Sequence, residues 1–205
     1  MRPTVLWLFV AVAYVVFFAW YTGPHDPLTP EEIDDYMQSF AERGRDPERL
    51  TAMRGFLEED DGGDFIIVNA IELYDEPVLT GAVEPGESSE EVLERYMAYM
   101  WPALLSRACH PVVAGDARVT VESWGVEGGE SFTAAGLMRY RSRRDMMEIA
   151  TNPAFFDAHQ YKVAAMSKTV AFAIEPRLNL GDPRWLVGLL LFSLGALLHL
   201  AFARR

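Results

Sequence analysis

Cysteine is nearly missing from this chain of 205 residues, which has only Cys109. A single cysteine excludes an internal disulfide, and two adjacent residues such as Cys109 and His110 seldom bind one metal ion. The spacings typical of zinc sites, CxxC, HxxxH and HExxH, do not occur, and neither do the GxSxG motif and the P-loop. The sequence therefore predicts no metal site and contains none of these catalytic motifs.

Charged residues are missing from both ends of the chain, over residues 3–24 and 185–203. About 18 helical residues, each rising 1.5 Å, span the roughly 30 Å hydrocarbon core of a bilayer. Trp20, Tyr21 and Trp185 lie where such helices would reach the lipid headgroups. Both stretches are therefore predicted to be transmembrane helices. The alternatives are a cleaved signal peptide for the first stretch and a buried core helix for the second.

The arginines beside these stretches predict an orientation, because such arginines favour the cytoplasmic side. Arg2 precedes the first stretch, and Arg204 and Arg205 follow the second. Arg177 and Arg184, which precede the second stretch, favour the opposite orientation. We expect both termini to be cytoplasmic, with the soluble part on the periplasmic side of the cytoplasmic membrane.

Basic residues are scarce in the roughly 155 residues between the two stretches, a length that suits one domain. All 30 acidic residues of the chain lie in residues 26–183, against 14 of its 18 basic residues, because Arg2, Arg184, Arg204 and Arg205 lie outside; this part therefore has a formal charge of −16. The negative electrostatic potential of such a domain does not attract nucleic acid or an anionic membrane surface. We expect no nucleic-acid partner; the membrane and another membrane protein are the partners that remain.

Helix and strand signals divide this acidic part into a regular series of elements. Thr29 before Pro30 and Asp46 before Pro47 predict the starts of two helices. The apolar run over residues 64–74 predicts a strand that is covered on both faces. The other predictions are a helix over residues 88–108 that Pro102 kinks or ends, strands over 117–126, 131–141 and 169–175, and helices over 142–150 and 153–168.

The order of these elements, β-α-β-β-α-β, is that of the ferredoxin-like split βαβ arrangement. We therefore expect an α+β fold, namely a ferredoxin-like βαββαβ domain with an N-terminal helical extension, flanked by two transmembrane helices. The predicted boundaries are residues 1–25 for the first transmembrane helix, 26–62 for the extension, 63–180 for the ferredoxin-like domain and 181–205 for the second transmembrane helix.

Two stretches carry a resemblance to a known group of proteins. They read "FIIVNAIEL", over residues 65–73, and "GLMRYRSRRDMMEIATNPAFFDAHQYKVAAMSKTVAFAIEP", over residues 136–176. Over roughly residues 64–176 the chain resembles the dimeric α+β barrel superfamily, in a branch of uncharacterised domains. The resemblance implies a homodimer in which two ferredoxin-like units pair their sheets. The superfamily includes monooxygenases, isomerases, heme enzymes and members without known activity, so the resemblance implies no single reaction.

One sub-branch, the heme-degrading monooxygenases of this fold, suggests candidate catalytic residues and heme as a cofactor. That family uses an asparagine on the first strand, an aromatic residue where the third strand meets the helix, and a heme-binding histidine on the last helix. The matching positions here are Asn69, Tyr140 and His159. The family has tryptophan where this chain has Tyr140, and the basic residues near the histidine are reduced to Lys162.

The residues themselves leave two interpretations open for His159 and for Asn69. His159 lies at the edge of an apolar helical stripe, where it is either a ligand or base in a pocket, or a histidine of the core or the dimer interface. Asn69 alternates with Ile67 and Ile71 on a buried strand face. It either points into the barrel cavity or pairs with a neighbouring backbone group.

Four arginines form the densest basic cluster of the chain: Arg139, Arg141, Arg143 and Arg144. Together with the N-terminus of the helix that follows, they are candidates for binding a carboxylate or phosphate. The alternative is that they balance charge within a strongly acidic domain.

Polar and small residues in the second apolar stretch are a weaker signal. His199 is a functional candidate because polar residues inside a membrane are costly. Gly188 and Gly195 offer small surfaces for helix packing.

For the whole chain we expect a membrane-anchored, extracytoplasmic dimeric domain that acts as a binding or assembly module. The alternative is a heme-binding or cofactor-independent, monooxygenase-like enzyme that uses the barrel cavity.

Overall fold

The structure, a computed structural model, describes residues 3–125 and 128–203. Residues 25–175 form one compact unit, and the two terminal segments form another. Each unit is described by itself below. The predicted boundaries at residues 25, 62 and 180 stay predictions.

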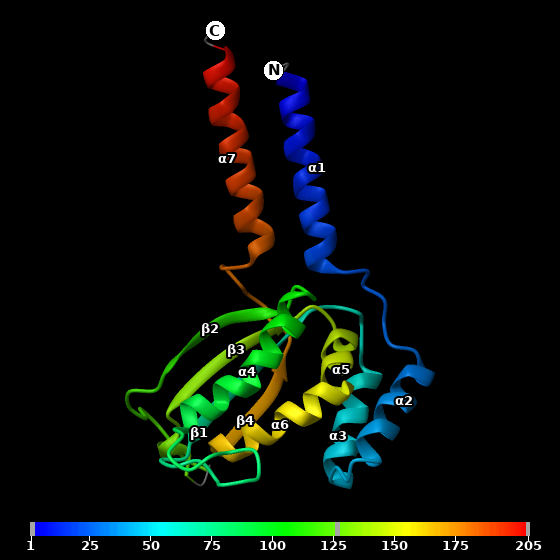
Figure 1. Cartoon of the computed structure of the whole chain (residues 1–205). Coiled ribbons are helices and arrows are strands. Elements are labelled where there is room, and N and C mark those ends of the chain that lie inside the picture. Colours follow the sequence, from blue (N-terminus) through cyan, green and yellow to red (C-terminus); the bar gives the residue numbers. More distant parts are fainter. Residues whose placement is uncertain (1–2, 126–127, 204–205) are drawn as a thin grey trace. The chain divides into compact units, whose positions relative to one another are not determined.

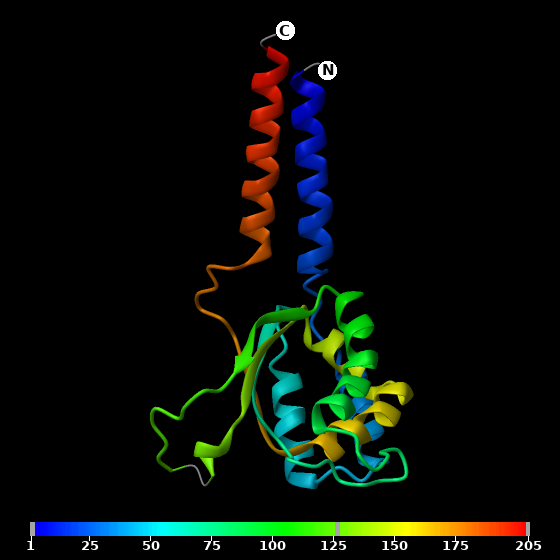
Figure 2. The same ribbon diagram turned by 60° about the vertical axis from the view of Figure 1, so that its left-hand side comes forward.

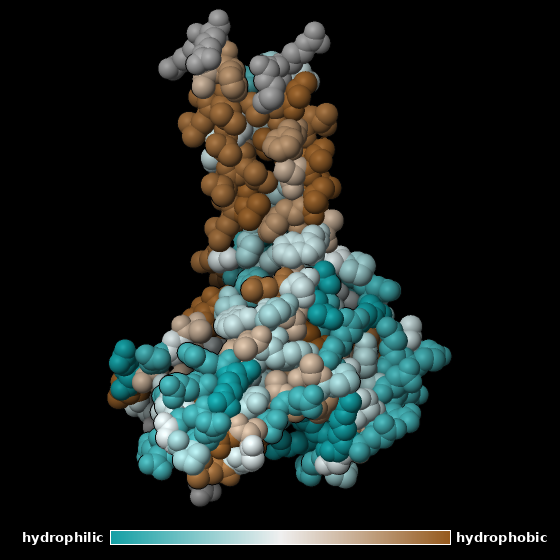
Figure 3. All heavy atoms as spheres, in the orientation of Figure 1, coloured by the Kyte–Doolittle hydropathy of each residue, from teal (hydrophilic) through white to brown (hydrophobic). Residues whose placement is uncertain are grey.

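The terminal unit is a pair of long helices, α1 (Pro3–Thr22) and α7 (Pro183–Ala203), which lie side by side in Figures 1 and 2. Both are long and apolar enough to cross a membrane, judged by length and composition. Only 6% of the apolar window of α7 is buried, so α7 is not a core helix. Its apolar side chains are exposed, as the brown surface in Figure 3 shows. Arg2, Arg204 and Arg205 lie outside the described residues, so the orientation stays a prediction.

Small residues let α1 and α7 approach closely. A Cβ atom added to Gly188 would lie 3.1 Å from the ring of Tyr14, and one added to Gly195 would lie 3.1 Å from the ring of Trp7. Trp7 also donates a hydrogen bond from Nε1 to Nδ1 of His199, at 3.2 Å. In this structure His199 therefore joins the two helices, on the same side as the glycines that let them pack.

The compact unit is built on a four-stranded antiparallel sheet. Its strands are β1 (Phe65–Leu73), β2 (His110–Asp116), β3 (Ala134–Tyr140) and β4 (Met166–Ile174), in the spatial order β2-β3-β1-β4. The connecting helices are α4 (Ser89–Leu105), α5 (Arg143–Thr151) and α6 (Pro153–Ala165). This is the ferredoxin-like α+β fold that the sequence predicts, with its second helix divided into α5 and α6.

Capping residues explain where these helices begin. The Ser88 hydroxyl accepts a hydrogen bond from the Glu91 amide at 3.2 Å, and Ser142 accepts one from the Asp145 amide at 3.0 Å. Asn152 ends α5 and caps α6 by accepting from the Ala154 amide at 2.9 Å. The predicted starts are confirmed, and α4 ends one turn after Pro102, which cannot donate to the helix ladder.

Helices α4 and α6 pack against each other on one face of the sheet (Figure 2). The core between them contains Tyr96, Met100 and Leu104 from α4 with Phe155 and Ala158 from α6. Cys109 joins this core and is fully buried, and burial raises the pKa of its thiol to about 11. Its role here is therefore that of a small packed side chain rather than a reactive thiolate.

The predicted strand over residues 117–126 is wrong, and the described part of that segment pairs with no other strand. The strand lies earlier, at β2, because β3 begins at Ala134 and offers partners only as far as Asp116. Pro111 made β2 hard to recognise in the sequence, since proline is rare inside strands. Proline is tolerated here because β2 is an edge strand with a register shift beside Pro111. Residue 126 lies outside the described residues.

The last strand also begins earlier than expected. It starts at Met166 instead of residue 169, because α6 ends at Ala165 and passes into β4 without a loop.

Helices α2 (Pro30–Ala41) and α3 (Pro47–Glu58) form the N-terminal extension and lie beside α5 (Figure 1). Their predicted caps, Thr29 and Asp46, are confirmed. The extension shares one apolar cluster with Met147 of α5, and that cluster consists of Leu28, Ile33, Met37, Phe40, Leu57 and Met147. The helical extension is therefore part of the compact unit.

A two-pronged ion pair adds to this packing. The guanidinium of Arg144 at the start of α5 donates to both carboxylate oxygens of Glu32 in α2, at 2.8 and 2.9 Å. The Arg144 guanidinium, helped by the Thr29 amide, lowers the pKa of Glu32 to about 2. The ionised carboxylate therefore stabilises the contact above pH 4.5, and this contribution is lost as pH falls from about 4.5 towards about 2.

We predict that Glu32→Gln lowers the free energy of unfolding at pH 7, because it removes the charge that pairs with Arg144. The loss should be only about 1 kcal/mol, because the pair is partly exposed. The difference should shrink as pH falls below 4.5, where the wild-type carboxyl loses its own contribution. Near-UV circular dichroism during thermal unfolding, from pH 7 to pH 3, measures both effects. Glu31→Gln, in the same helical turn, is the matched control. Equal stability of wild type and Glu32→Gln at pH 7 would contradict the prediction.

Candidate functional site

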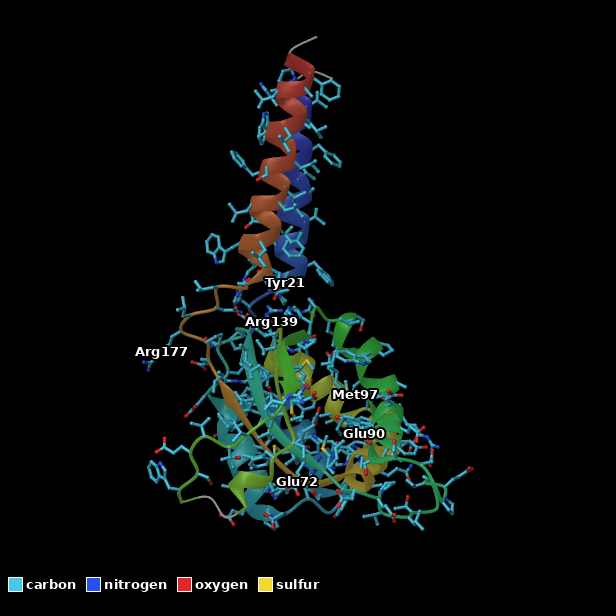
Figure 4. All side chains as sticks on the ribbon, turned by 90° about the vertical axis from the view of Figure 1, so that its left-hand side faces the viewer. Tyr21, Glu72, Glu90, Met97, Arg139 and Arg177 are labelled. Carbon is cyan, nitrogen blue, oxygen red and sulfur yellow. The ribbon has the colours of Figure 1, made fainter. Side chains whose placement is uncertain are left out.

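A cavity of about 550 Å³ lies between α4 and the face of the sheet that the helices cover. The wall from α4 includes Leu93, Met97 and Trp101, spaced by three or four residues so that they share one side of the helix. Met97, labelled in Figure 4, stands on α4. The opposite wall comes from β1 and β3, and includes Ile67 and Met138.

The cavity is hollow because the sheet is lined with small residues where α4 passes over it. Ala114, Ala134 and Gly136 form part of the floor. A Cβ atom added to Gly136 would meet only Ala114 and Val113 at 3.9 Å, an ordinary contact distance. The backbone therefore accepts a side chain at Gly136, and the space above it is unfilled.

Asn69 lies opposite Gly136 in the β1–β3 pairing and lines the cavity. Its side-chain nitrogen donates long hydrogen bonds to the carbonyl oxygens of Ile67 at 3.3 Å and of Gly136 at 3.4 Å. Asn69 therefore does both things that its sequence position allows. Its side chain faces the cavity, and its amide nitrogen donates to backbone carbonyl groups of the sheet.

Two tyrosines, Tyr96 of α4 and Tyr140 of β3, also line the cavity. Tyr140 stacks on Phe65, with ring centroids 5.5 Å apart and planes 13° apart. Burial raises the pKa of both phenols, and the nearby Tyr96 raises that of Tyr140 further. Both hydroxyls are therefore protonated donors, and within residues 3–125 and 128–203 neither has a hydrogen-bond partner. Sequence reasoning missed Tyr96, because its position in the stripe of α4 reads as ordinary core.

Lys162 of α6 is the one basic residue among the cavity-lining side chains of the described residues. Its Nζ lies 5.7 Å from the centroid of the Tyr96 ring. Burial lowers the pKa of Lys162, and the positive charge of Arg45 lowers it further. Lys162 follows His159 by one helical turn, and sequence reasoning named it only as a basic residue near that histidine.

His159 is not among the residues that line the cavity. Its ring contacts Tyr96 and Phe155, with centroid distances of 6.4 and 5.3 Å. Burial, together with the charges of Lys162 and Arg45, lowers the pKa of His159 to about 4, so the ring is neutral at pH 7. The structure brings Asn69 and Tyr140 into one cavity and leaves His159 outside it. These residues therefore do not fit a heme bound in this cavity with His159 as its axial ligand.

Each arginine of the cluster binds a different acidic partner. Arg139 is buried, donates to Asp64 at 2.8 Å, and also donates to the carbonyl oxygen of Ala108 at 2.8 Å. Arg141 donates to both carboxylate oxygens of Asp145, at 2.7 and 2.8 Å.

The other two arginines also pair with acidic residues in distant segments of the chain. Arg143 is buried, lies over the ring of Phe56 and donates to Glu175 at 3.1 Å. Arg144 pairs with Glu32 of the extension. All four thus balance acidic residues, and an anion that bound them would have to displace those carboxylates. Their ligand-binding role stays a prediction.

Comparison with known proteins bears on the fold. No protein-family model matches the chain, and no curated protein matches it. The chain is similar to the solved structure of RPA0582, a protein of unknown function from Rhodopseudomonas palustris, with 16% identity over 66% of this chain and 96% of that chain and a TM-score of 0.54. A methylated form of RPA0582 matches with 17% identity over 78% of this chain and 99% of that chain, at a TM-score of 0.55.

The chain has the ferredoxin-like α+β fold. The structural likeness and the strand order agree on this, as the sequence resemblance implied. SnoaB, a cofactor-independent oxygenase from Streptomyces nogalater, matches with 12% identity over 58% of this chain and 98% of that chain, at a TM-score of 0.38. A likeness at that level carries nothing about activity.

We predict that His159 titrates near pH 4, far below the ordinary 6.5 of histidine. Since its pKa is lowered on folding, the neutral ring stabilises the fold above pH 6.5, and this contribution is lost as pH falls from 6.5 towards about 4. NMR of the imidazole resonances measures the midpoint directly. His159→Leu should flatten the loss of stability between pH 6.5 and 4.

The matched control is His25→Asn, at an exposed position whose φ of 50° asparagine tolerates. A midpoint for His159 at 6 or above would contradict the prediction.

Proposed function

We propose that the chain is a membrane-anchored, homodimeric ferredoxin-like domain that binds a small, mostly apolar ligand between α4 and the sheet. The observation that carries this proposal is the cavity of about 550 Å³ with mostly apolar walls. Small-molecule sites are typically clefts of about 300 to 1,000 Å³, apolar for the most part, with a few convergent polar groups. Asn69, Tyr96, Tyr140 and Lys162 are polar groups of that kind.

The energetics of burial favour a ligand in this hollow. The hollow is open to solvent on one side, since Trp101, Ala114 and Asp116 of its lining are exposed. A ligand that covers its apolar walls gains about 25 cal/mol for each Å² of apolar surface removed from water. A side chain at Gly136 would fill part of the hollow without strain in the backbone. A retained hollow with unpaired phenol groups therefore suits a bound molecule.

The sheet supports the proposed dimer through its other face. Because side chains alternate along a strand, the partners of Val68 point away from the cavity that Ile67 and Asn69 line. Val68 pairs with Phe172 of β4 and with Leu137 of β3, and Leu137 pairs with Val113 of β2. Leu137 and Val113 also border the cavity, so Val68 and Phe172 define the outer face most clearly. Phe172 is 53% exposed, and Val170 beside it on β4 is 44% exposed. A second copy would cover this apolar face, as in the superfamily that the sequence resembles.

The terminal helices support the membrane anchor. α1 and α7 each supply about 30 Å of apolar helix, and they pack together through Gly188 and Gly195. The cytoplasmic placement of both termini, with the domain on the periplasmic side, is part of the proposal and rests on the arginines at the chain ends.

An enzyme in the same cavity is the second candidate. The observation that favours it is that Asn69 and Tyr140, two of the three positions that the resemblance to the monooxygenases of this fold implies, line one cavity. A ligand that is recovered chemically unchanged after long incubation with the protein in air would contradict this second candidate.

We predict that Gly136→Leu weakens ligand binding at least tenfold, because the new side chain enters the cavity. The full chain is placed in discs of phosphatidylcholine bilayer, and 2-naphthylmethanol is the probe. Equilibrium dialysis against empty discs separates binding to the protein from partition into lipid. Gly81→Leu, in a loop with nothing within 4 Å, is the matched control. Equal binding by Gly136→Leu and wild type would place the probe elsewhere and contradict the proposed site.

We predict that Phe172→Asp converts a dimer into a monomer, because a carboxylate on the apolar sheet face would lose its hydration in the dimer. Sedimentation of the detergent-solubilised full chain reports the mass. Leu79→Asp, which changes a loop residue that is 64% exposed, is the control and should leave the dimer intact. A wild-type protein that sediments as a monomer at high concentration would overturn the dimer.

A further inference from the structure

Lysine is rare in this chain, and one of its two lysines lines the cavity. The basic residues comprise 16 arginines and only Lys162 and Lys168. Lys168 has an acidic partner, Glu72, at 3.0 Å. Lys162 has no carboxylate or carbonyl partner among the residues that the structure describes. An unpaired cation at this position contrasts with the four paired arginines described above.

The surroundings of Lys162 offer it little compensation for burial. Its Nζ has the ring face of Tyr96 at 5.7 Å, and cation–π contacts contribute only about 0.5–2 kcal/mol. Removing an ammonium group from water costs more than that unless it is paired. The neighbouring charge of Arg45 is also positive, so it adds repulsion rather than pairing.

Charged groups near the cavity confirm this imbalance. Asp116 also lines it, but its side chain is 75% exposed and lies 3.6 Å from Arg118. Asp116 is not among the charges that act on Lys162, whereas Arg45 is. The neutral His159 ring lies one turn away on the same helix. The inner wall of the cavity therefore has a positive charge and no described negative charge to balance it.

Donors also outnumber acceptors among the polar groups of the wall. The hydroxyls of Tyr96 and Tyr140 are both protonated, both line the cavity, and neither is used by another described residue. With the ammonium of Lys162 they make three donor groups. The complementary group on a ligand is an acceptor with negative charge, since a positive group would be repelled and an alkyl group would leave all three donors unpaired.

We propose that the ligand of this cavity is a carboxylate with an apolar body, its carboxylate oxygens bound by Lys162 and by the hydroxyls of Tyr96 and Tyr140. This inference rests on the proposed ligand-binding function and specifies its chemistry. The apolar body lies among the side chains of α4 and β1, including Leu93, Met97 and Ile67. A charge-assisted hydrogen bond from Lys162 favours a carboxylate over neutral groups, and hydrogen bonds from the two phenol hydroxyls orient that carboxylate.

The experiment compares three probes of nearly equal shape and different charge: 2-naphthoate, 2-naphthylmethanol and 2-naphthylmethylammonium. The full chain is again in phosphatidylcholine discs, with empty discs as blanks in equilibrium dialysis. We expect 2-naphthoate to bind at least tenfold more tightly than the alcohol, and the ammonium probe to bind more weakly than the alcohol.

The variants test which residue determines the preference for the carboxylate probe. Lys162→Met keeps the length of the side chain and should weaken naphthoate binding at least tenfold, while binding of the alcohol stays within twofold. Lys168→Met, the only other lysine, should leave both unchanged. Tyr96→Phe should weaken naphthoate binding severalfold. Thermal unfolding followed by circular dichroism checks that each variant is folded, and the three-probe comparison on the wild type does not depend on any variant.

The outcomes separate this inference from the proposed function. Equal binding of naphthoate and the alcohol to the wild type, or unchanged naphthoate binding by Lys162→Met, would overturn the carboxylate while the cavity remained a binding site. Failure of all three probes to bind the wild type would overturn the binding function and the inference with it. Loss of naphthoate binding in Lys162→Met alone supports both.

Discussion

The central position of β1 is the constraint on which the rest of the domain depends. It pairs with β3 on one side and β4 on the other, so both of its edges are satisfied and both of its faces must be covered. Ile67, Asn69 and Ile71 face the helices, while Val68 and Ala70 face away. The two-residue period of one strand thus separates the ligand cavity from the apolar face assigned to the dimer.

Charge organises the domain at a second level. A formal charge of −16 would favour expansion through self-repulsion, yet the four clustered arginines each reach an acid in another segment or turn. Arg144 joins α5 to the extension, and Arg143 reaches Glu175 just after β4. The basic cluster therefore ties separate parts of an acidic chain together. Lys162 differs from it in position, and among the described residues it has no such partner.

Local signals made most of the fold predictable. Caps such as Thr29, Ser142 and Asn152 act within three residues, so sequence alone located their helices. β2 was misplaced because the tolerance of Pro111 depends on its being an edge strand, which is a property of the assembled sheet. The cavity could not be predicted either. It arises where small residues of β2 and β3 meet α4, and no local pattern reports the space left between them. The partner of Arg144, 112 residues away, is equally invisible to spacing.

The direct passage from α6 into β4 limits how this protein can change in length. Other connections, such as residues 117–125 between β2 and β3, have loop residues that an insertion could extend. Between Ala165 and Met166 there are none. One extra residue there would exchange the two faces of β4, so that Val170 and Phe172 would point towards the helices and small alanines would point outwards. Insertions and deletions in related chains should therefore avoid this junction, and a tag or a fused domain is better placed in the loop after β2.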